Sequence, residues 1–135
     1  MRTIFSSSII ISIVAVDQLT KVLVKKFEIA GTCNLGFAFG FGPGFFNDLI
    51  SLAVLIFVSI LLIREKKRLV MLGYSLVVSG GLSNLIDRLI RGCVTDFINW
   101  PILTRWPAFN LADAAITVGV VILALSMLKD FRVRE

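Results

Sequence analysis

The chain alternates between long apolar runs and short polar segments. An α-helix of about 20 apolar residues spans the hydrocarbon core of a bilayer. A helix of a soluble protein would carry a polar face, and these runs have none of useful width. The pattern predicts an all-α membrane protein with four transmembrane helices, built as one domain over residues 1–135. The predicted spans are residues 4–24, 49–63, 69–90 and 109–128.

Two of the runs need a separate interpretation. The first follows Met1 and Arg2 and resembles a secretory signal peptide, but it lacks a small-residue cleavage site and continues to Val24. We therefore expect an uncleaved first helix. The second run, residues 49–63, is short for a span. Tilt, or flanking side chains that reach the interface, would make up the difference.

The segment between the first two runs, residues 25–48, is rich in glycine and phenylalanine. Glycine at this density disfavours a helix, and its alternation with phenylalanine favours a short hairpin or an extended loop at the membrane surface. A glycine-rich connector with apolar anchors is the simpler alternative. Within it, Asn34 and Gly36 stand out as a polar residue closely followed by a glycine. We expect a small extracytoplasmic β or loop element here.

Composition and charge agree with a membrane protein. Hydrophobic residues make up 57% of the chain and the net charge is +5, whereas an average soluble domain is about 45–50% apolar. The basic residues gather at residues 64–68 and in the C-terminal tail, which is where the positive-inside bias places cytoplasmic loops. We therefore expect both termini in the cytoplasm and the site residues toward the external face. Membrane lipids, rather than nucleic acid, are the expected partners.

An ionisable pair lies inside the first run. Asp17 and Lys21 are spaced i and i+4, which places them on one face of a helix. Ionisable residues within a span normally face the protein interior or water and mark function. The alternative is an interfacial ion pair that orients the helix end, and the spacing leaves both interpretations open.

Three of the nine acidic residues, Asp87, Asp96 and Asp113, lie beside apolar runs. The chain has no histidine, which excludes a Ser-His-Asp triad, a Cys-His pair and a histidine-based metal site. Two carboxylates brought close together share a proton, and one can act as general base on water while the other polarises a carbonyl. An aspartyl pair is therefore an economical hydrolytic mechanism that needs no metal or cofactor. The spacing does not choose between Asp87 and Asp96.

Structural roles compete with this chemistry. Asn110 followed three positions later by Asp113 is a sensible helix start, because asparagine caps a helix and an acid favours the positive end of its dipole. Asn84, Asp87 and Arg88 would equally form a polar cluster that locks helices together. The two cysteines, at positions 33 and 93, are expected to be small apolar residues without a bond, although an oxidising compartment would allow them to pair.

Two other functions fit the same features. A non-enzymatic transporter subunit or scaffold would use Asp17 and Lys21 in an ion path, with polar residues spread through the membrane depth. A Ser–Lys peptidase would need Lys21 beside an exposed serine, and Ser83 is the candidate.

Several blocks, in register along all four runs, resemble the lipoprotein signal peptidases (signal peptidase II), a family of bacterial membrane aspartyl peptidases. The resemblance implies removal of signal peptides from prolipoproteins, by hydrolysis before a cysteine that carries diacylglycerol. It also implies a multi-pass protein of the bacterial cytoplasmic membrane with its site near the outer leaflet. The blocks are Asp17–Lys21, Asn34–Gly40, Asn84–Arg88, Val94–Phe97 and Pro107–Asp113.

By this resemblance the catalytic pair falls on Asp96 and Asp113, and Asp87 becomes a supporting residue. Three departures from the family pattern are visible: a short stretch between Lys21 and Asn34, Ser83 in place of a glycine, and Thr95 in place of a common valine. The short stretch implies a reduced substrate cradle. The supporting residues implied by the resemblance are Asp17, Lys21, Asn34, Gly36, Asn84, Asp87, Arg88 and Asn110.

Overall fold

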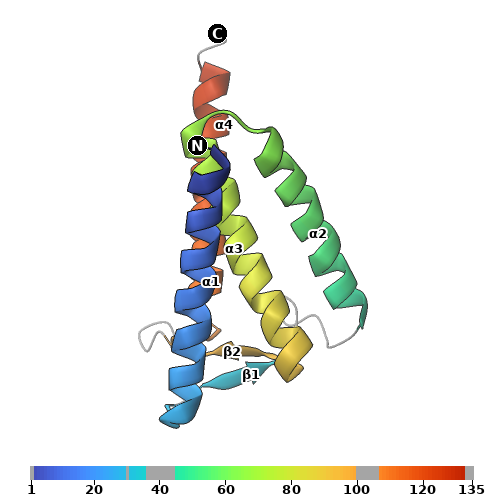
Figure 1. Ribbon diagram of the computed structural model, residues 1–135, viewed down its shortest axis with the longest axis vertical. Coiled ribbons are helices and arrows are strands. Elements are labelled where there is room, and N and C mark those ends of the chain that lie inside the picture. The colour runs from blue at the N-terminus through green and yellow to red at the C-terminus, as the bar shows by residue number, and fades with distance from the viewer. Residues whose placement is uncertain (1, 30, 36–44, 100–106, 133–135) are drawn as a thin grey trace.

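The computed structural model describes residues 2–29, 31–35, 45–99 and 107–132. Within these ranges the chain forms helices joined by a small sheet (Figure 1). The elements are α1 (Arg2–Lys26), β1 (Thr32–Asn34), α2 (Phe45–Arg64), α3 (Arg68–Arg91), β2 (Val94–Asp96) and α4 (Leu111–Arg132).

The helices follow the predicted apolar runs closely. The largest differences are in α2, which begins at Phe45 rather than at residue 49, and in α4, which ends at Arg132 rather than at residue 128. α4 also begins at Leu111 rather than at residue 109, because Phe109 forms a β-bridge with Ile98. Three helices, α1, α3 and α4, are long and apolar enough to cross a membrane. In the described part of the chain α2 is not among them, and a fourth span therefore stays a prediction.

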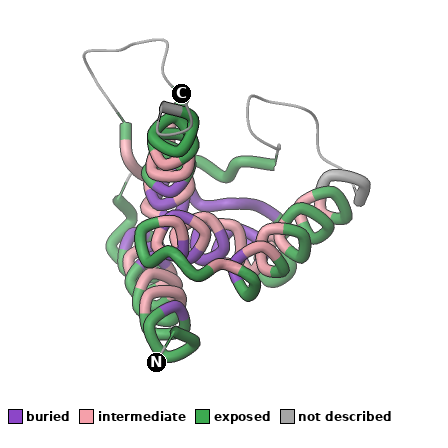
Figure 2. The backbone as a smooth tube through the Cα atoms, turned by 90° about the horizontal axis from the view of Figure 1, so that it is seen from above, coloured by how far each residue is buried: buried purple, intermediate pink, exposed green. Residues whose placement is uncertain are grey.

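Helix α3 is the centre of the structure. It packs against each of the other three helices, most extensively against α4. Figures 1 and 2 both show α2 standing away from α1 and α4, with α3 between them. Residues on α3 can therefore reach side chains from every other helix, which suits it to carry a shared site.

Glycines allow α3 and α4 to approach closely. A Cβ at Gly80 would overlap the carbonyl oxygen of Ala112, and a Cβ at Gly119 would lie 2.7 Å from the carbonyl oxygen of Gly73. Small residues at such positions let helix backbones pack tightly in lipid. Because Asn84 follows Gly80 by one helical turn, this contact brings Asn84 against the beginning of α4.

The distribution of buried residues is the reverse of that in a soluble protein. The largest fully buried side chains are polar or charged, whereas large apolar side chains such as Ile11, Phe57 and Val118 are exposed. Apolar side chains on the outer surface are suited to contact with lipid. Charged side chains within the spans of a membrane protein normally face the protein interior. The pattern confirms the membrane character expected from the sequence.

Both terminal helix ends lie at the end of the molecule opposite the sheet (Figure 1). There the Arg2 guanidinium (Nη1) donates to the Glu65 carbonyl oxygen at 3.2 Å, and Lys67 Nζ pairs with Asp130 Oδ2 at 2.5 Å. The start of α1, the α2–α3 loop and the last turns of α4 are thus held together. The basic cluster at residues 64–68 belongs to this end.

A β element is present in the segment where a hairpin or an extended loop was expected, but its partner strand is not local. Strand β1 pairs antiparallel with β2, which follows α3, and the described residues contain no strand partner from within residues 25–48. Gly92, with φ 74°, ends α3 in the left-handed conformation and redirects the chain into β2. Residues 36–44 of the glycine-rich segment lie outside the described residues. The paired positions are Thr32 with Asp96, Cys33 with Thr95, and Asn34 with Val94.

Candidate active site

Asp113 lies in the first turn of α4, where it is part of a reciprocal cap. The Asp113 backbone N–H donates to Asn110 Oδ1 at 2.9 Å, and the Asn110 N–H donates to Asp113 Oδ2 at 3.2 Å. This is the geometry of a capping box, in which two helix-terminal donors are satisfied reciprocally. The structural interpretation of the Asn110–Asp113 spacing is therefore confirmed. It also fixes the Asp113 carboxylate at the positive end of the helix dipole.

Asp96 ends β2 and is 2% exposed. Its carboxylate accepts hydrogen bonds from Asn34 Nδ2 at 2.9 Å and from Asn110 Nδ2 at 2.7 Å. Burial raises the pKa of Asp96 above its ordinary value of 3.8, and repulsion from the Asp113 carboxylate raises it further. The hydrogen bonds from the two asparagines and the charge of Lys21 oppose that rise. Asp96 is accordingly the carboxyl that holds a proton more readily than an ordinary aspartate.

Two asparagines link the two carboxylates. Asn84 Nδ2 donates to Asp113 Oδ1 at 2.8 Å, and Asn110 Nδ2 donates both to Asp96 and, at 3.2 Å, to Asn84 Oδ1. These hydrogen bonds form a continuous network from Asp96 through Asn110 and Asn84 to Asp113. Residues from β2, α3 and the start of α4 therefore converge on one point.

A buried cluster of charges lies directly behind Asn84. Lys21 Nζ is 2.6 Å from Asp17 Oδ2 and 3.0 Å from Asp87 Oδ2, and all three side chains are fully buried. Lys21 Nζ also donates to Asn84 Oδ1 at 3.1 Å. That hydrogen bond fixes which end of the Asn84 amide faces Asp113, because only the Nδ2 end can donate to a carboxylate. Lys21 thus acts on the carboxylate pair through Asn84.

Asp17 ties α1 to both neighbouring helices. It accepts hydrogen bonds from Ser83 Oγ at 2.7 Å and from the Ala112 backbone N–H at 3.0 Å. Because Ala112 is in the first turn of α4, Asp17 stabilises the same helix end as Asp113. An interfacial ion pair would be exposed, and the Asp17–Lys21 pair is not. Ser83 is also fully buried, which does not suit it as the exposed nucleophile of a Ser–Lys peptidase.

The carboxylate oxygens of Asp87 accept hydrogen bonds and an ion pair from several side chains and one backbone N–H. Besides Lys21, it accepts from Gln18 Nε2 at 2.9 Å, from the Arg91 guanidinium at 2.6 Å and from the Thr95 N–H at 3.2 Å. A carboxylate held by this many donors joins α1, α3 and β2. It leaves little of its surface for a water or a substrate.

The remaining expected site residues are placed less centrally. Arg88 is half-buried and its Nε lies 3.8 Å from Asp48 Oδ1 on α2. Asn34 is exposed but reaches Asp96. Gly36 lies outside the described residues. The structure therefore brings together Asp17, Lys21, Asn34, Asn84, Asp87, Asp96, Asn110 and Asp113.

Three features of the site were not predicted from the sequence. Gln18 and Arg91 both donate to Asp87, and the i, i+4 spacing of Asp87 and Arg91 was the available signal for the second. The expectation of two unbonded cysteines was wrong, because Cys33 and Cys93 form a disulfide with a Cα–Cα distance of 5.6 Å. The long-range pairing of β1 with β2 brings these cysteines together.

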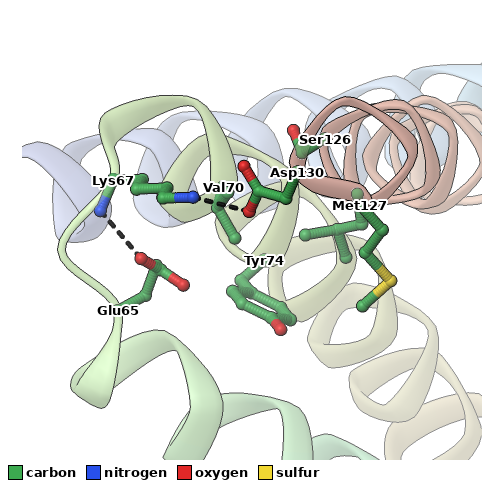
Figure 3. A pocket seen from close by; sticks show the side chains of 8 residues that line it. Glu65, Lys67, Val70, Tyr74, Ser126, Met127 and Asp130 are labelled. Atoms are coloured by element: carbon green, nitrogen blue, oxygen red, sulfur yellow. Dashed lines mark hydrogen bonds and ion pairs between the residues drawn. The ribbon is translucent and has the colours of Figure 1, made fainter. Parts of the chain in front are cut away.

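A cavity of about 160 Å³ lies at the opposite end of the helices (Figure 3). Its lining includes Glu65, Lys67, Tyr74, Ser126 and Asp130. None of the candidate site residues lines it. The cavity is therefore separate from the carboxylate pair.

Apolar helices that enclose buried charged side chains define a class, namely a membrane protein. A family model described as signal peptidase (SPase) II matches residues 9–129. The chain is 38% identical over 152 aligned positions to the lipoprotein signal peptidase of Geobacter metallireducens, covering 96% of this chain and 93% of that protein. It is 37% identical to the lipoprotein signal peptidase of Thermodesulfovibrio yellowstonii, covering 87% and 90%.

Two solved structures are also similar, both described as bacterial membrane enzymes determined by the in meso method. The first gives a TM-score of 0.84 at 27% identity, covering 97% of this chain and 92% of that chain. The second gives a TM-score of 0.78 at 28% identity, covering 93% and 94%. The chain belongs to the signal peptidase II family and is a peptidase, as the sequence resemblance implied.

Proposed function

We propose that this protein is an aspartic endopeptidase that removes signal peptides from prolipoproteins. It cuts the peptide bond that precedes the diacylglyceryl-modified cysteine, and Asp96 and Asp113 are its catalytic pair. The observation that carries the proposal is the chain of hydrogen bonds that joins the two carboxylates through Asn110 and Asn84. The substrate is taken from the names of the relatives, which are lipoprotein signal peptidases.

The two carboxyl groups divide the acid and base roles. Asp96 is the acid, because burial and repulsion from Asp113 raise its pKa and favour its protonated form. Its O–H polarises the scissile carbonyl. Asp113 is the base: its carboxylate lies at the start of α4, and it takes a proton from the attacking water. The proton that Asp113 takes from water then passes to the nitrogen of the leaving amine. Asp96 recovers its proton from the tetrahedral intermediate as the C=O bond re-forms, so the coupled pair ends with one proton, as it began.

The asparagines and Lys21 hold this division of roles in place. Asn84 and Asn110 each donate to a catalytic carboxylate. Lys21 fixes the orientation of the Asn84 amide. Preorganised donors of this kind need no rearrangement during the reaction. Asp17, Asp87 and the other supporting residues then act by holding this frame.

We further propose that α2 is a fourth span and that the site faces the external side. The basic residues near the α2–α3 loop and both helix termini share one end of the molecule, and the positive-inside bias assigns that end to the cytoplasm. The disulfide between Cys33 and Cys93 lies at the other end. Disulfides persist in oxidising compartments, which supports an external position for that end. The lipid chains of the substrate would remain in the bilayer.

The test is processing of a diacylglyceryl-modified prolipoprotein by purified protein in detergent. Asp96→Asn and Asp113→Asn each remove one acid–base group and should lower the rate by about 10²–10⁴-fold. Asp130→Asn is the matched control, because Asp130 pairs with Lys67 at the opposite end. It should process at the parent rate. Parent-like processing by either catalytic-site variant would refute the assignment of that residue.

A further inference from the structure

The Cys33–Cys93 disulfide joins the two strands that carry Asp96 and one of its hydrogen-bond donors. The cysteines are 60 positions apart, and they are the only two in the chain. Cys33 directly precedes Asn34, which donates to Asp96. Cys93 directly precedes β2, which ends at Asp96. The covalent bond therefore spans the same two strands as the Asn34–Asp96 hydrogen bond.

β1 is a short strand at the exposed edge of the sheet. The strand has three residues, all of them exposed, and pairs on one side only. A two-stranded sheet of this size is marginally stable in water. The further contact from Thr32 Oγ1 to the Asp96 carbonyl oxygen is long, at 3.4 Å. β2, in contrast, is fully buried, and the strand that the disulfide restrains is β1.

We propose that the Cys33–Cys93 disulfide is a positioning element for the catalytic pair, and that its reduction releases Asn34 from Asp96 and slows peptide hydrolysis. This inference rests on the proposed function. It assigns the cysteines a role in presenting the Asn34 amide to Asp96. It also makes the rate of the enzyme dependent on the redox state of its surroundings.

The redox step involves thiols only. A dithiol attacks one sulfur of the disulfide to give a mixed disulfide and one protein thiolate, and its second thiol then displaces the other cysteine. Two electrons and two protons pass to the protein, which becomes the dithiol form, while the reagent becomes a cyclic disulfide. Cys33 is exposed and Cys93 is buried, which makes the Cys33 sulfur the accessible point of attack. A small disulfide such as oxidised glutathione reverses the exchange.

Loss of the Asn34 hydrogen bond has a definite pH signature. The charged groups that act on Asp96 are Lys21 from α1 and Asp113 from α4, while Asp87 of α3 accepts the neighbouring Thr95 N–H. The Asn34 bond lowers the pKa of Asp96 and so opposes the effect of burial. Without it, Asp96 keeps its proton to higher pH. Because the mechanism needs that proton, the alkaline limb of the pH–rate profile should move upward.

The experiment measures kcat/KM for prolipoprotein processing across pH, with the full chain in detergent, before and after treatment with dithiothreitol. We expect reduction to lower kcat/KM by up to about tenfold, because a hydrogen bond to the protonated Asp96 carboxyl is worth about this factor at most. The alkaline limb should move to higher pH. Oxidised glutathione should restore both values. The substrate cysteine is a thioether, and the reagent leaves it unchanged.

Two variants separate positioning from simple stabilisation. The double variant Cys33→Ser/Cys93→Ser should resemble the reduced parent and should not respond to dithiothreitol. Asn34→Ala, with the disulfide intact, should show the same displaced limb, and reduction should displace it little further. Thermal unfolding of each form is recorded in parallel.

The outcomes are distinct. An unchanged kcat/KM and an unmoved alkaline limb after verified reduction would overturn the proposal. A rate that falls only in step with thermal stability, with the limb unmoved, would overturn it as well, because the disulfide would then merely stabilise the fold. An oxidised parent that fails to process prolipoprotein at all would instead contradict the proposed function.

Discussion

Replacing Lys21 by methionine tests whether the buried charge cluster holds the site together. The change keeps most of the side-chain volume but removes the cation that lies 2.6 Å from Asp17 and 3.0 Å from Asp87. Both carboxylates would stay fully buried with their neutralising partner gone. Removing one partner of a buried ion pair costs about 3–5 kcal/mol of folding free energy. We expect Lys21→Met to lose at least this much.

Lys67→Met is the matched control for this substitution. Lys67 also forms a close ion pair, with Asp130, but the two side chains are 62% and 53% exposed. Exposed pairs of this kind contribute about 0–1 kcal/mol. The same chemical change should therefore have very different effects at the two positions. The pair Lys21→Met/Asp17→Asn, which removes one charge of each sign, should recover part of the loss.

The assay is equilibrium unfolding in detergent, followed by circular dichroism, for the parent and the three variants. Activity gives a second measure. Lys21 also fixes the Asn84 amide, and Lys21→Met should slow prolipoprotein processing even where the protein remains folded. If Lys21→Met and Lys67→Met lose the same small free energy, the buried cluster is not a stabilising element and the reasoning fails.

Three further predictions concern packing, capping and pH. Gly80→Ala should destabilise the fold by about 1–3 kcal/mol, because its Cβ would overlap the Ala112 carbonyl, whereas Gly81→Ala meets only Leu55 at 3.3 Å and should be mild; similar melting temperatures would contradict this. Asn110→Ala should cost about 1 kcal/mol as a lost cap and should also slow processing, since Asn110 donates to Asp96; an unchanged rate would contradict its bridging role. Activity should fall on the alkaline side only above the ordinary range of an aspartate, because the raised pKa keeps Asp96 protonated to higher pH; an alkaline limb near pH 4 would contradict the assignment of Asp96 as the acid.

The helices were predictable from the sequence because each apolar run has its own local signal. Hydrophobic length identifies α1, α3 and α4 without reference to anything else in the chain. Even the cap of α4 was predictable, since the Asn110–Asp113 spacing is a local pattern. The local sequence pattern thus placed Asp113 in the first turn of a helix.

The partner of Asp113 was not predictable from spacing. Asp87 and Asp96 both lie next to apolar segments, and only the surroundings distinguish them. Asp87 is saturated by donors from α1, α3 and the Thr95 backbone, whereas Asp96 is bridged to Asp113 by asparagines. These contacts come from elements far apart in the chain. The resemblance to a known family pointed to Asp96 where the residue pattern alone could not.

The small sheet and the disulfide were missed for a related reason. A glycine-rich segment favours an extended backbone, but its sequence does not predict which strand it pairs with. β1 pairs with β2 across two intervening helices, and the same topology brings Cys33 to Cys93. Pairing at such a separation depends on how the helices pack. The presence of two cysteines in the sequence therefore did not predict that they form a disulfide.

The spacing of the buried charges has a consequence for how the protein enters its membrane. Asp17 and Lys21 form an i, i+4 pair within α1, and Asp87 and Arg91 form another within α3. A lone charge at the centre of an inserting helix costs about 2.5–3.5 kcal/mol on insertion scales. Asp17 and Asp87 instead each have a counter-charge one turn away on their own helix, which offsets part of that cost. When α1 and α3 pack together, Lys21 gains Asp87 as a second partner. The same charges that lower the cost of insertion then form an ion pair between the assembled helices.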